Sequence, residues 1–399
     1  MKILQLCNKP PYPPVDGGTL AMNSITQGLL AAECEVRVLS MCSDKHRVLE
    51  DRMTDEYREA TRFEAVYVDL NIHPLDAGVA LLCGESYHVK RFESKAFATR
   101  LREILEEETF DIIHVESVFL TPYLPLIRKH SQAPVLLRAH NVEHLIWRRV
   151  AQSERNPFKR WYVKNLSLTL GAYEREHIND YDGVVSITEN DARLLREMGC
   201  RKPITSIPFG ISPESLENVE VEPNSLFHLG SMDWMPNQEG IQWFLDEVWP
   251  LVHEQMPQLT LYLAGRKMSP ELLHLQMEGV KVVGEVPDAM YFIATKQINI
   301  VPLLSGSGIR VKIIEAMSAG KTVIATTIGA EGIAYTDGKN ILLADTPDQF
   351  VQQLKHCVDD LDFCQQVGRN AYTLIAEEYG NQRLTEKMLS FYEKFLNRE

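Results

Sequence analysis

The stretch that decides the fold runs Asn299-Ile300-Val301-Pro302-Leu303-Leu304, then Ser305-Gly306-Ser307-Gly308, then Ile309-Arg310-Val311-Lys312-Ile313-Ile314-Glu315-Ala316-Met317-Ser318-Ala319-Gly320. An apolar strand leads into a Gly/Ser turn, and the turn opens a short helix. Gly320 stands where a glycine in the left-handed conformation ends a helix. A strand, a glycine-rich turn and a helix in this order predict an α/β unit that can bind a phosphate group.

The same alternation of short β-branched runs with longer helical patterns extends along the whole chain. Near-continuous apolar runs separated by helices are typical of buried parallel strands. The predicted strands cover residues 2–7, 35–41, 65–70, 111–117, 134–140, 183–188 and 204–211, then 225–232, 259–265, 279–286, 298–304, 322–326 and 340–345. Two successive Rossmann-like α/β domains follow from this pattern.

The boundary between the two domains lies near residues 208–224, a segment rich in proline and acidic residues with no helical period. We therefore assign residues 1–208 to the first domain and residues 209–380 to the second. In residues 381–399 an apolar stripe recurs every three or four positions, formed by Leu384, Met388, Phe391 and Phe395. Such a helix needs a partner surface, and we expect it to return to the first domain.

Composition excludes several classes of protein. The chain has 399 residues and a formal net charge of -14, which disfavours nucleic acid as a partner. Its seven cysteines are scattered and never form a C-x-x-C pair, so neither a disulfide framework nor a zinc site is indicated. It has no long apolar run and no secretory signal, and we expect a cytoplasmic protein.

The turn at residues 305–308 and the helix after it carry the expected chemistry. Backbone N–H groups at a helix start bind phosphate, and glycines at positions 306 and 308 leave room for its approach. Arg310 and Lys312 add positive charge for a leaving diphosphate. Glu315 could accept hydrogen bonds from a ribose. The alternative interpretation is that Lys312 and Glu315 form only a solvent-exposed i,i+3 pair.

The run Pro302 to Gly332 resembles the signature of retaining glycosyltransferases of family 4, which have the GT-B fold of two Rossmann-like domains facing across a cleft. Glu315-Ala316-Met317-Ser318-Ala319-Gly320 is similar to the family's Glu-Ala-Met-x-x-Gly segment. This resemblance implies a metal-independent enzyme without a cofactor and assigns Glu315 to the nucleotide ribose. The family's first acidic position is Ser307 here, and the Arg-x-Lys at 310–312 resembles a branch concerned with polysaccharide assembly.

The resemblance extends to both domains. It implies a UDP-, GDP- or ADP-sugar donor and a glycan or lipid-linked acceptor. Met235 and Pro236 stand where the family often has a phosphate-binding lysine, and Arg266 after the next strand is the candidate replacement. In the first domain, Gly17 and Gly18 match the family's Gly-Gly loop. His140 matches a strand-end histidine that faces the donor sugar. The simpler interpretations are a solvated arginine, a plain turn and a structural histidine.

Two further stretches have competing interpretations. Residues 147–164 interleave basic and aromatic side chains, which suits an anionic membrane surface or an ordinary pair of helices with solvated charges. Asp360-Leu361-Asp362 has the spacing of a metal-binding Asp-x-Asp but lies in a polar helical pattern, residues 352–366, far from any strand end. We expect no metal there.

The alternative functions are a nucleotide-sugar epimerase or phosphorylase of the same fold, and a non-catalytic partner subunit that binds nucleotide sugars. A nicotinamide oxidoreductase is disfavoured, because no G-x-G-x-x-G follows the first strand.

Overall fold

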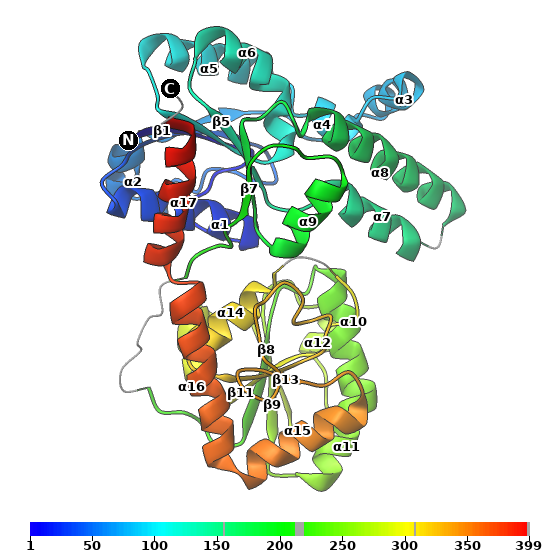
Figure 1. Ribbon diagram of the computed structural model, residues 1–399. Helices are drawn as coiled ribbons and strands as arrows, with labels where there is room; N and C mark the ends of the chain where they lie inside the picture. Colours follow the sequence, from blue (N-terminus) through cyan, green and yellow to red (C-terminus); the bar gives the residue numbers. More distant parts are fainter. Residues whose placement is uncertain (155, 212–218, 307–308, 397–399) are drawn as a thin grey trace. The chain divides into compact units, whose positions relative to one another are not determined.

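The computed structural model describes residues 1–154, 156–211, 219–306 and 309–396. The chain divides into two compact units (Figure 1). The N-terminal unit consists of Met1–Gly210 together with Asn381–Glu399, and the C-terminal unit is Ile211–Gly380. Each unit is an α/β domain built on a parallel sheet, as the sequence predicts.

The sheet of the N-terminal unit has the strand order β3-β2-β1-β4-β5-β6-β7, and all of its pairings are parallel. Its strands are β1 (Lys2–Cys7), β2 (Glu35–Cys42), β3 (Glu64–Tyr67), β4 (Ile112–Glu116), β5 (Val135–Ala139), β6 (Gly183–Ser186) and β7 (Ile204–Ser206). The order reverses between β1 and β4, so the loops after these two strands diverge and leave space for a ligand at the carboxyl edge of the sheet.

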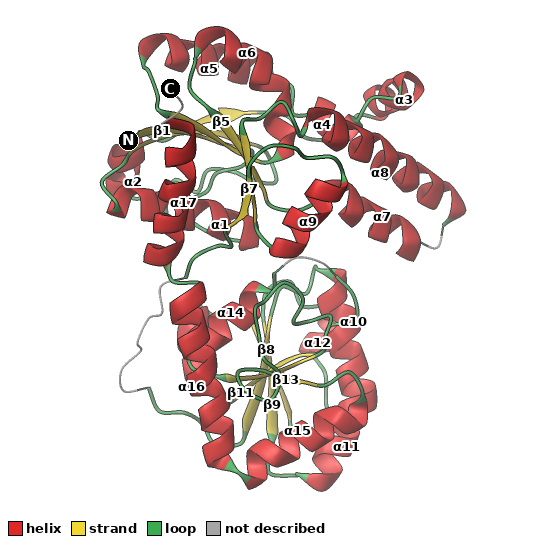
Figure 2. Cartoon of the chain, viewed as in Figure 1, coloured by secondary structure: helices red, strands yellow, loops and turns green. Residues whose placement is uncertain are grey.

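Helices cover both faces of this sheet (Figure 2). They are α1 (Gly17–Ala31), α2 (Asp55–Thr61), α3 (Pro74–Cys83), α4 (Tyr87–Lys90), α5 (Lys95–Glu107), α6 (Leu124–His130), α7 (Glu143–Ser153), α8 (Pro157–His177), α9 (Glu189–Glu197) and α17 (Asn381–Leu396), with a 3-10 turn at Val118–Tyr123. Asp16 caps α1 by accepting from the backbone N–H of Thr19 at 2.8 Å.

The C-terminal helix α17 packs on the N-terminal unit, against α1 (Figure 1). Its apolar stripe, Leu384, Met388, Phe391 and Phe395, is at most 5% exposed and joins the core formed by α1, β1 and β2. Gly183 on β6 makes room for this helix, since a Cβ there would lie 2.5 Å from the ring of Phe395. The expected return of this helix to the first domain is confirmed.

The sheet of the C-terminal unit has the order β10-β9-β8-β11-β12-β13 and is also parallel. Its strands are β8 (Ser225–Leu229), β9 (Thr260–Ala264), β10 (Val280–Gly284), β11 (Ile298–Val301), β12 (Thr322–Ala325) and β13 (Leu342–Leu343). Its helices are α10 (Met235–Trp243), α11 (Trp249–Gln255), α12 (Pro270–Leu273), α13 (Ala289–Ala294), α14 (Val311–Ser318), α15 (Pro347–Asp359) and α16 (Leu361–Glu378), with a π-helical turn at Phe244–Val248. The order reverses between β8 and β11.

One local prediction is corrected. The polar stretch 352–366 is not one helix, because α15 ends before Asp360 and α16 begins after it. Asp360 caps α16 by accepting from the backbone N–H of Phe363 at 2.9 Å. The Asp-x-Asp spacing therefore comes from a helix cap. Across the described residues, the acidic, histidine and cysteine side chains form no cluster suited to a metal ion.

Candidate functional site

The candidate site of the C-terminal unit lies where β8 and β11 end, at the reversal of strand order. The loop after β8 contains Gly230, and β11 is followed by Ser305 and Gly306 and then, beyond residues 307 and 308, by α14. Ser307 and Gly308 lie outside the described residues. Parallel sheets bind ligands at such a reversal.

Lys312 is the central charged group of this site. It lies on the first turn of α14, and its Nζ donates to Asn237 Oδ1 at 2.6 Å and contacts His228 Nε2 at 3.1 Å. His228 Nδ1 lies 2.9 Å from the carbonyl oxygen of Ile300. A carbonyl can only accept, so Nδ1 carries the proton of this imidazole and Nε2 accepts from Lys312. Sequence reasoning missed both His228 and Asn237, which are far from Lys312 along the chain.

Burial and, to a smaller extent, the neighbouring Arg310 lower the pKa of Lys312 to about 7. Glu315 opposes this shift only weakly. Burial likewise holds the pKa of His228 well below its usual range. Lys312 is thus a partly desolvated amine that would regain its full charge beside a bound anion.

Glycines shape the floor of this site. A Cβ on Gly230 would lie 2.5 Å from Lys312 Nζ, and a Cβ on Gly265 would lie 1.8 Å from the carbonyl oxygen of Gly230. Gly265 also has a φ of 143°, which side chains rarely adopt. The absence of a side chain at Gly265 lets the ends of β8 and β9 approach one another, and its absence at Gly230 leaves room for the amine of Lys312.

Arg310 precedes α14 and is only 4% exposed. Its guanidinium lies 5.5 Å from the ring centre of Trp234, and its Nη2 donates to the carbonyl oxygen of Ile328 at 3.4 Å. Gly306 has a φ of 121°, and a Cβ there would lie 3.0 Å from Arg310 Nη2. The structure therefore brings Arg310 next to the glycine-rich turn.

Glu315 is half-buried one turn after Lys312, and burial raises its pKa. The amine of Lys312 bonds to Asn237 and His228, and the described ion pairs include none between Lys312 and Glu315. This arrangement disagrees with the alternative of a solvent-exposed pair. Arg266 lies in the exposed loop after β9, where its carbonyl oxygen accepts from Met232 N at 2.9 Å.

In the N-terminal unit, Gly17 and Gly18 form the first turn of α1, directly after Asp16. Lys9 extends from the end of β1 and pairs with Asp16 at 2.7 Å. A Cβ on Gly18 would lie 3.0 Å from Lys9 Nζ. The Gly-Gly turn is thus bordered by a lysine that sequence reasoning did not single out.

His140 lies at the end of β5 and belongs to a buried polar network. Its Nε2 lies 2.7 Å from Glu116 Oε2, and Glu116 Oε1 accepts from Gln5 Nε2 at 2.8 Å. His114 Nε2 lies 3.3 Å from the same Oε1. Sequence reasoning missed Glu116, whose apolar strand gives no sign of a function.

The protonation of this network follows from its contacts. Burial alone would raise the pKa of Glu116, but His114, His140 and Arg138 together hold it well below its usual range. Burial lowers the pKa of His140, while Glu116 opposes that shift. An ionised carboxylate accepts, so Nε2 of His140 donates to Glu116. This bond fixes the ring, and a ligand contact would involve Nδ1.

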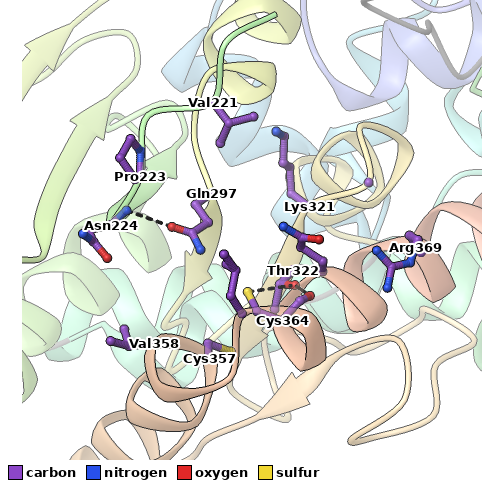
Figure 3. Close-up of a pocket in the computed structure, with 13 residues that line it drawn as sticks. Val221, Pro223, Asn224, Gln297, Lys321, Thr322, Cys357, Val358, Cys364 and Arg369 are labelled. Atoms are coloured by element: carbon purple, nitrogen blue, oxygen red, sulfur yellow. Dashed lines mark hydrogen bonds between the residues drawn. The ribbon is translucent and has the colours of Figure 1, made fainter.

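A second cavity of the C-terminal unit, about 500 Å³ in volume, lies away from this site. Asn224, Gln297 and Thr322, at the amino ends of β8, β11 and β12, line it together with residues of α15 and α16 (Figure 3). Cys364 donates to Thr322 Oγ1 at 3.6 Å in its wall. Because parallel strands run in one direction, this cavity is at the opposite edge of the sheet from Lys312.

Both halves of the chain match known domain families. A family model described as glycosyl transferase 4-like domain matches residues 16–210, and one described as glycosyl transferases group 1 matches residues 223–360. A protein of Klebsiella pneumoniae described as an uncharacterized 44.6 kDa protein in the cps region is 25% identical over 301 residues, which are 72% of this chain and 75% of that relative.

Several solved structures share the fold. HepE of Anabaena in complex with UDP has a TM-score of 0.68 at 15% identity and covers 99% of this chain and 100% of its own. Sucrose-phosphate synthase of Thermosynechococcus elongatus has a TM-score of 0.69 at 16% identity, with 99% of each chain covered. The pneumococcal O-GlcNAc transferase GtfA, in complex with UDP and GlcNAc, has a TM-score of 0.66 at 12% identity and covers 100% of this chain and 99% of its own.

Proposed function

We propose that this chain, a glycosyltransferase of the GT-B fold, moves a sugar from a nucleotide-diphosphate donor to a glycan or lipid-linked acceptor with retention of the anomeric configuration. The two family matches cover residues 16–210 and 223–360, and the strand orders of the two units agree with two Rossmann-like domains. A UDP-sugar is the first donor to test, because neighbours of the same fold were solved with UDP.

The observation that carries this proposal is the environment of Lys312. An amine whose pKa has fallen to about 7 is poorly hydrated and gains more from a nearby dianion than an exposed lysine does. Negative charge accumulates on the leaving nucleoside diphosphate as its bond to the sugar breaks. A cation held in place by Asn237 and His228 stabilises that charge without reorganising.

The other site residues take roles that the resemblance implies. Arg310, with Gly306, Ser307 and Gly308, completes the contacts to the diphosphate, and Arg266 supplements them from the next loop. Glu315 accepts hydrogen bonds from the ribose.

Within the N-terminal unit, we assign His140 to the donor sugar. The bond from its Nε2 to Glu116 orients the ring, which supports a positioning contact to sugar hydroxyls through Nδ1. Gly17 and Gly18 shape the binding surface for donor and acceptor. In the reaction we propose, the acceptor oxygen bonds to the anomeric carbon while the bond to the phosphate breaks, and a phosphate oxygen takes the acceptor proton. This route requires no separate protein base and no metal ion.

We place the reaction in the synthesis of a cell-surface polysaccharide or glycoconjugate, at the inner face of the membrane. The Arg-x-Lys resemblance supports this role, and the Klebsiella relative from a cps region agrees with it. The described residues contain no helix that is both long and apolar enough to cross a bilayer. We propose that this part of the chain makes a peripheral membrane contact.

We propose residues 147–164 for that contact. Phe158 is 84% exposed and Trp161 is 59% exposed on α8, among the exposed cations Lys159, Arg160 and Lys164. Arg155 lies outside the described residues. Flotation with anionic vesicles tests the contact: binding that is lost in Lys159→Ala/Arg160→Ala supports it, and absence of binding by the native chain refutes it.

Neighbouring α3 adds apolar surface to the same region. Ala77 and Ala80 pack on Leu166 of α8, whereas Leu75 and Leu82 on the other face are 86% and 89% exposed. Isolated large aliphatic side chains are common on protein surfaces, but a stripe along one helix face marks a contact site.

Donor turnover tests the proposed function. A thermal-shift screen with UDP, GDP, ADP and their sugars identifies the donor, because a ligand that binds the folded chain raises its melting temperature. Slow hydrolysis of that donor, with the configuration of the released sugar followed by NMR, then tests the transferase. Conversion of the donor to an epimer would instead indicate an epimerase, phosphate-dependent release a phosphorylase, and binding without turnover a non-catalytic subunit.

A further inference from the structure

The N-terminal unit contains a cavity of about 530 Å³ at the carboxyl ends of β1 and β2. Lys9, Lys45, His46 and Arg91 line it, and Asp44 is the one carboxylate among its described lining residues. We propose that this cavity binds a negatively charged group, a phosphate or a carboxylate, on the acceptor. The identity of the ligand as the acceptor rests on the proposed function, whereas the residues of this unit alone support an anion site.

The charge of this cavity is opposite in sign to the net charge of the chain. The whole sequence has a formal net charge of -14, yet basic side chains dominate this cavity. The carboxylate of Asp44 already has partners: Arg47 at 3.6 Å, Tyr67 Oη at 3.2 Å and Nδ2 of Asn71, another lining residue, at 3.3 Å. Throughout the described part of the chain, no carboxylate lies within ion-pair distance of Lys45 or Arg91. Two cations without a carboxylate partner in one cavity of an acidic protein favour an anionic ligand.

Arg91 is a cation of this cavity whose donors have few hydrogen-bond acceptors. Its Nη1 donates to the carbonyl oxygen of Leu70 at 3.4 Å, and its guanidinium lies 5.6 Å from the ring centre of Phe92. Its Nε is buried without a hydrogen-bond partner. A buried guanidinium N–H without an acceptor is costly, so Arg91 gains from an anion that moves into its reach.

His46 lies in the same positively charged environment, near Lys9 and Lys45. Burial lowers the pKa of its imidazole, Lys9 and Lys45 lower it as well, and Asp16 opposes the shift. Asp16 is the cap of α1, directly before Gly17 and Gly18, and Lys9 pairs with it at 2.7 Å. Lys9 therefore lines the cavity and also borders the Gly-Gly turn. An acceptor anchored there by its charged group would have its hydroxyl groups near that turn.

We assign the donor diphosphate to Arg310 and Lys312 of the C-terminal unit, and a different ligand to this cavity. The cavity also has apolar walls, contributed by Leu70, Ile72 and Phe92. Apolar walls beside a cationic group suit a sugar ring that carries one charged substituent, since the ring can contact them through its C–H surface.

Differential acylation tests the site on the full chain saturated with UDP. The amine of Lys45 is labelled with acetic anhydride and quantified by mass spectrometry, with Lys129, an exposed lysine of α6, as the internal control. Glucose 6-phosphate and glucuronate are the two anionic probes, and glucose is the neutral probe. We expect the anionic probes to slow acylation of Lys45 about tenfold at saturation, while glucose leaves both lysines unchanged. The better of the two probes identifies phosphate or carboxylate as the group bound.

Variants of Arg91 provide a second test in the same acylation experiment. We expect Arg91→Gln to lose the protection of Lys45 and Arg91→Lys to retain part of it, whereas the exposed Arg102→Gln on α5 retains all of it. Equal acylation of Lys45 with and without the anionic probes overturns the proposal, as does full protection in Arg91→Gln. Failure of UDP to bind would contradict the proposed function but leave the Lys45 measurement readable, so the two failures are distinguishable.

Discussion

Donor binding should depend on pH through Lys312. Its pKa in the free chain is about 7, because the site desolvates the amine and Arg310 repels its charge. A bound diphosphate favours the ammonium and raises that pKa. Binding therefore takes up a proton above pH 7, and affinity falls as the pH rises. For a group whose pKa falls on binding, the affinity would instead rise with pH.

The size of the effect follows from the fraction of Lys312 that is already protonated. With a pKa of about 7, nearly all of the free chain carries the ammonium at pH 6, but about one molecule in eleven does so at pH 8. The affinity should drop about tenfold over this interval, which is about 1.4 kcal/mol. The drop ends where the pH passes the raised pKa of the complex.

Calorimetry with UDP-glucose between pH 6 and pH 9 measures this dependence. UDP-glucose is preferable to UDP, because the terminal phosphate of UDP has a second pKa of about 6 and would add its own titration. Lys312→Met should bind more weakly at pH 6 and show no decline toward pH 8. Lys339→Met, which removes an exposed lysine of the same unit, should behave like the native chain. A pH-independent affinity of the native chain, or the same decline in Lys312→Met, would refute the assignment.

Three further variants test other parts of the structure. Glu315→Ala should weaken nucleotide binding by about 2 kcal/mol through loss of a charge-assisted hydrogen bond; calorimetry that gives the same affinity for it and for the exposed Glu254→Ala contradicts the ribose contact. Gly265→Ala should lower the free energy of unfolding by more than about 2 kcal/mol, because its Cβ meets the carbonyl oxygen of Gly230, whereas Gly78→Ala in α3, where a Cβ has open space, should raise it by about 1 kcal/mol in urea unfolding. Glu116→Gln should cost about 3 kcal/mol at pH 7, since it leaves the buried Arg138 without its nearby carboxylate and gives His140 a weaker acceptor. The pKa of Glu116 is lowered in the folded chain, so its contribution is present above pH 4.5 and shrinks as the pH falls; a native-to-variant difference that does not shrink toward pH 4 would contradict this account.

The amino-acid pattern predicts most of the fold, because buried parallel strands must be apolar on both faces and their connecting helices must be amphipathic. The same pattern predicts that α17 packs on another surface, since four large apolar side chains on one helix face have to be buried. The glycine-rich turn before α14 can also be predicted from the sequence, because clusters of glycine and serine between a strand and a helix mark a turn. These features depend on residues close together in the chain.

The tertiary structure alone decided the environment of those residues. Lys312 meets His228 and Asn237, which are more than seventy positions away, and their contacts set its pKa. Glu116 reads as part of a buried strand, and only the pairing of β4 with β5 brings it to His140. A local pattern specifies secondary structure because propensity and periodicity act over a few residues. The charge state and partners of a side chain depend on which strands lie next to each other, and folding of the whole domain sets that order.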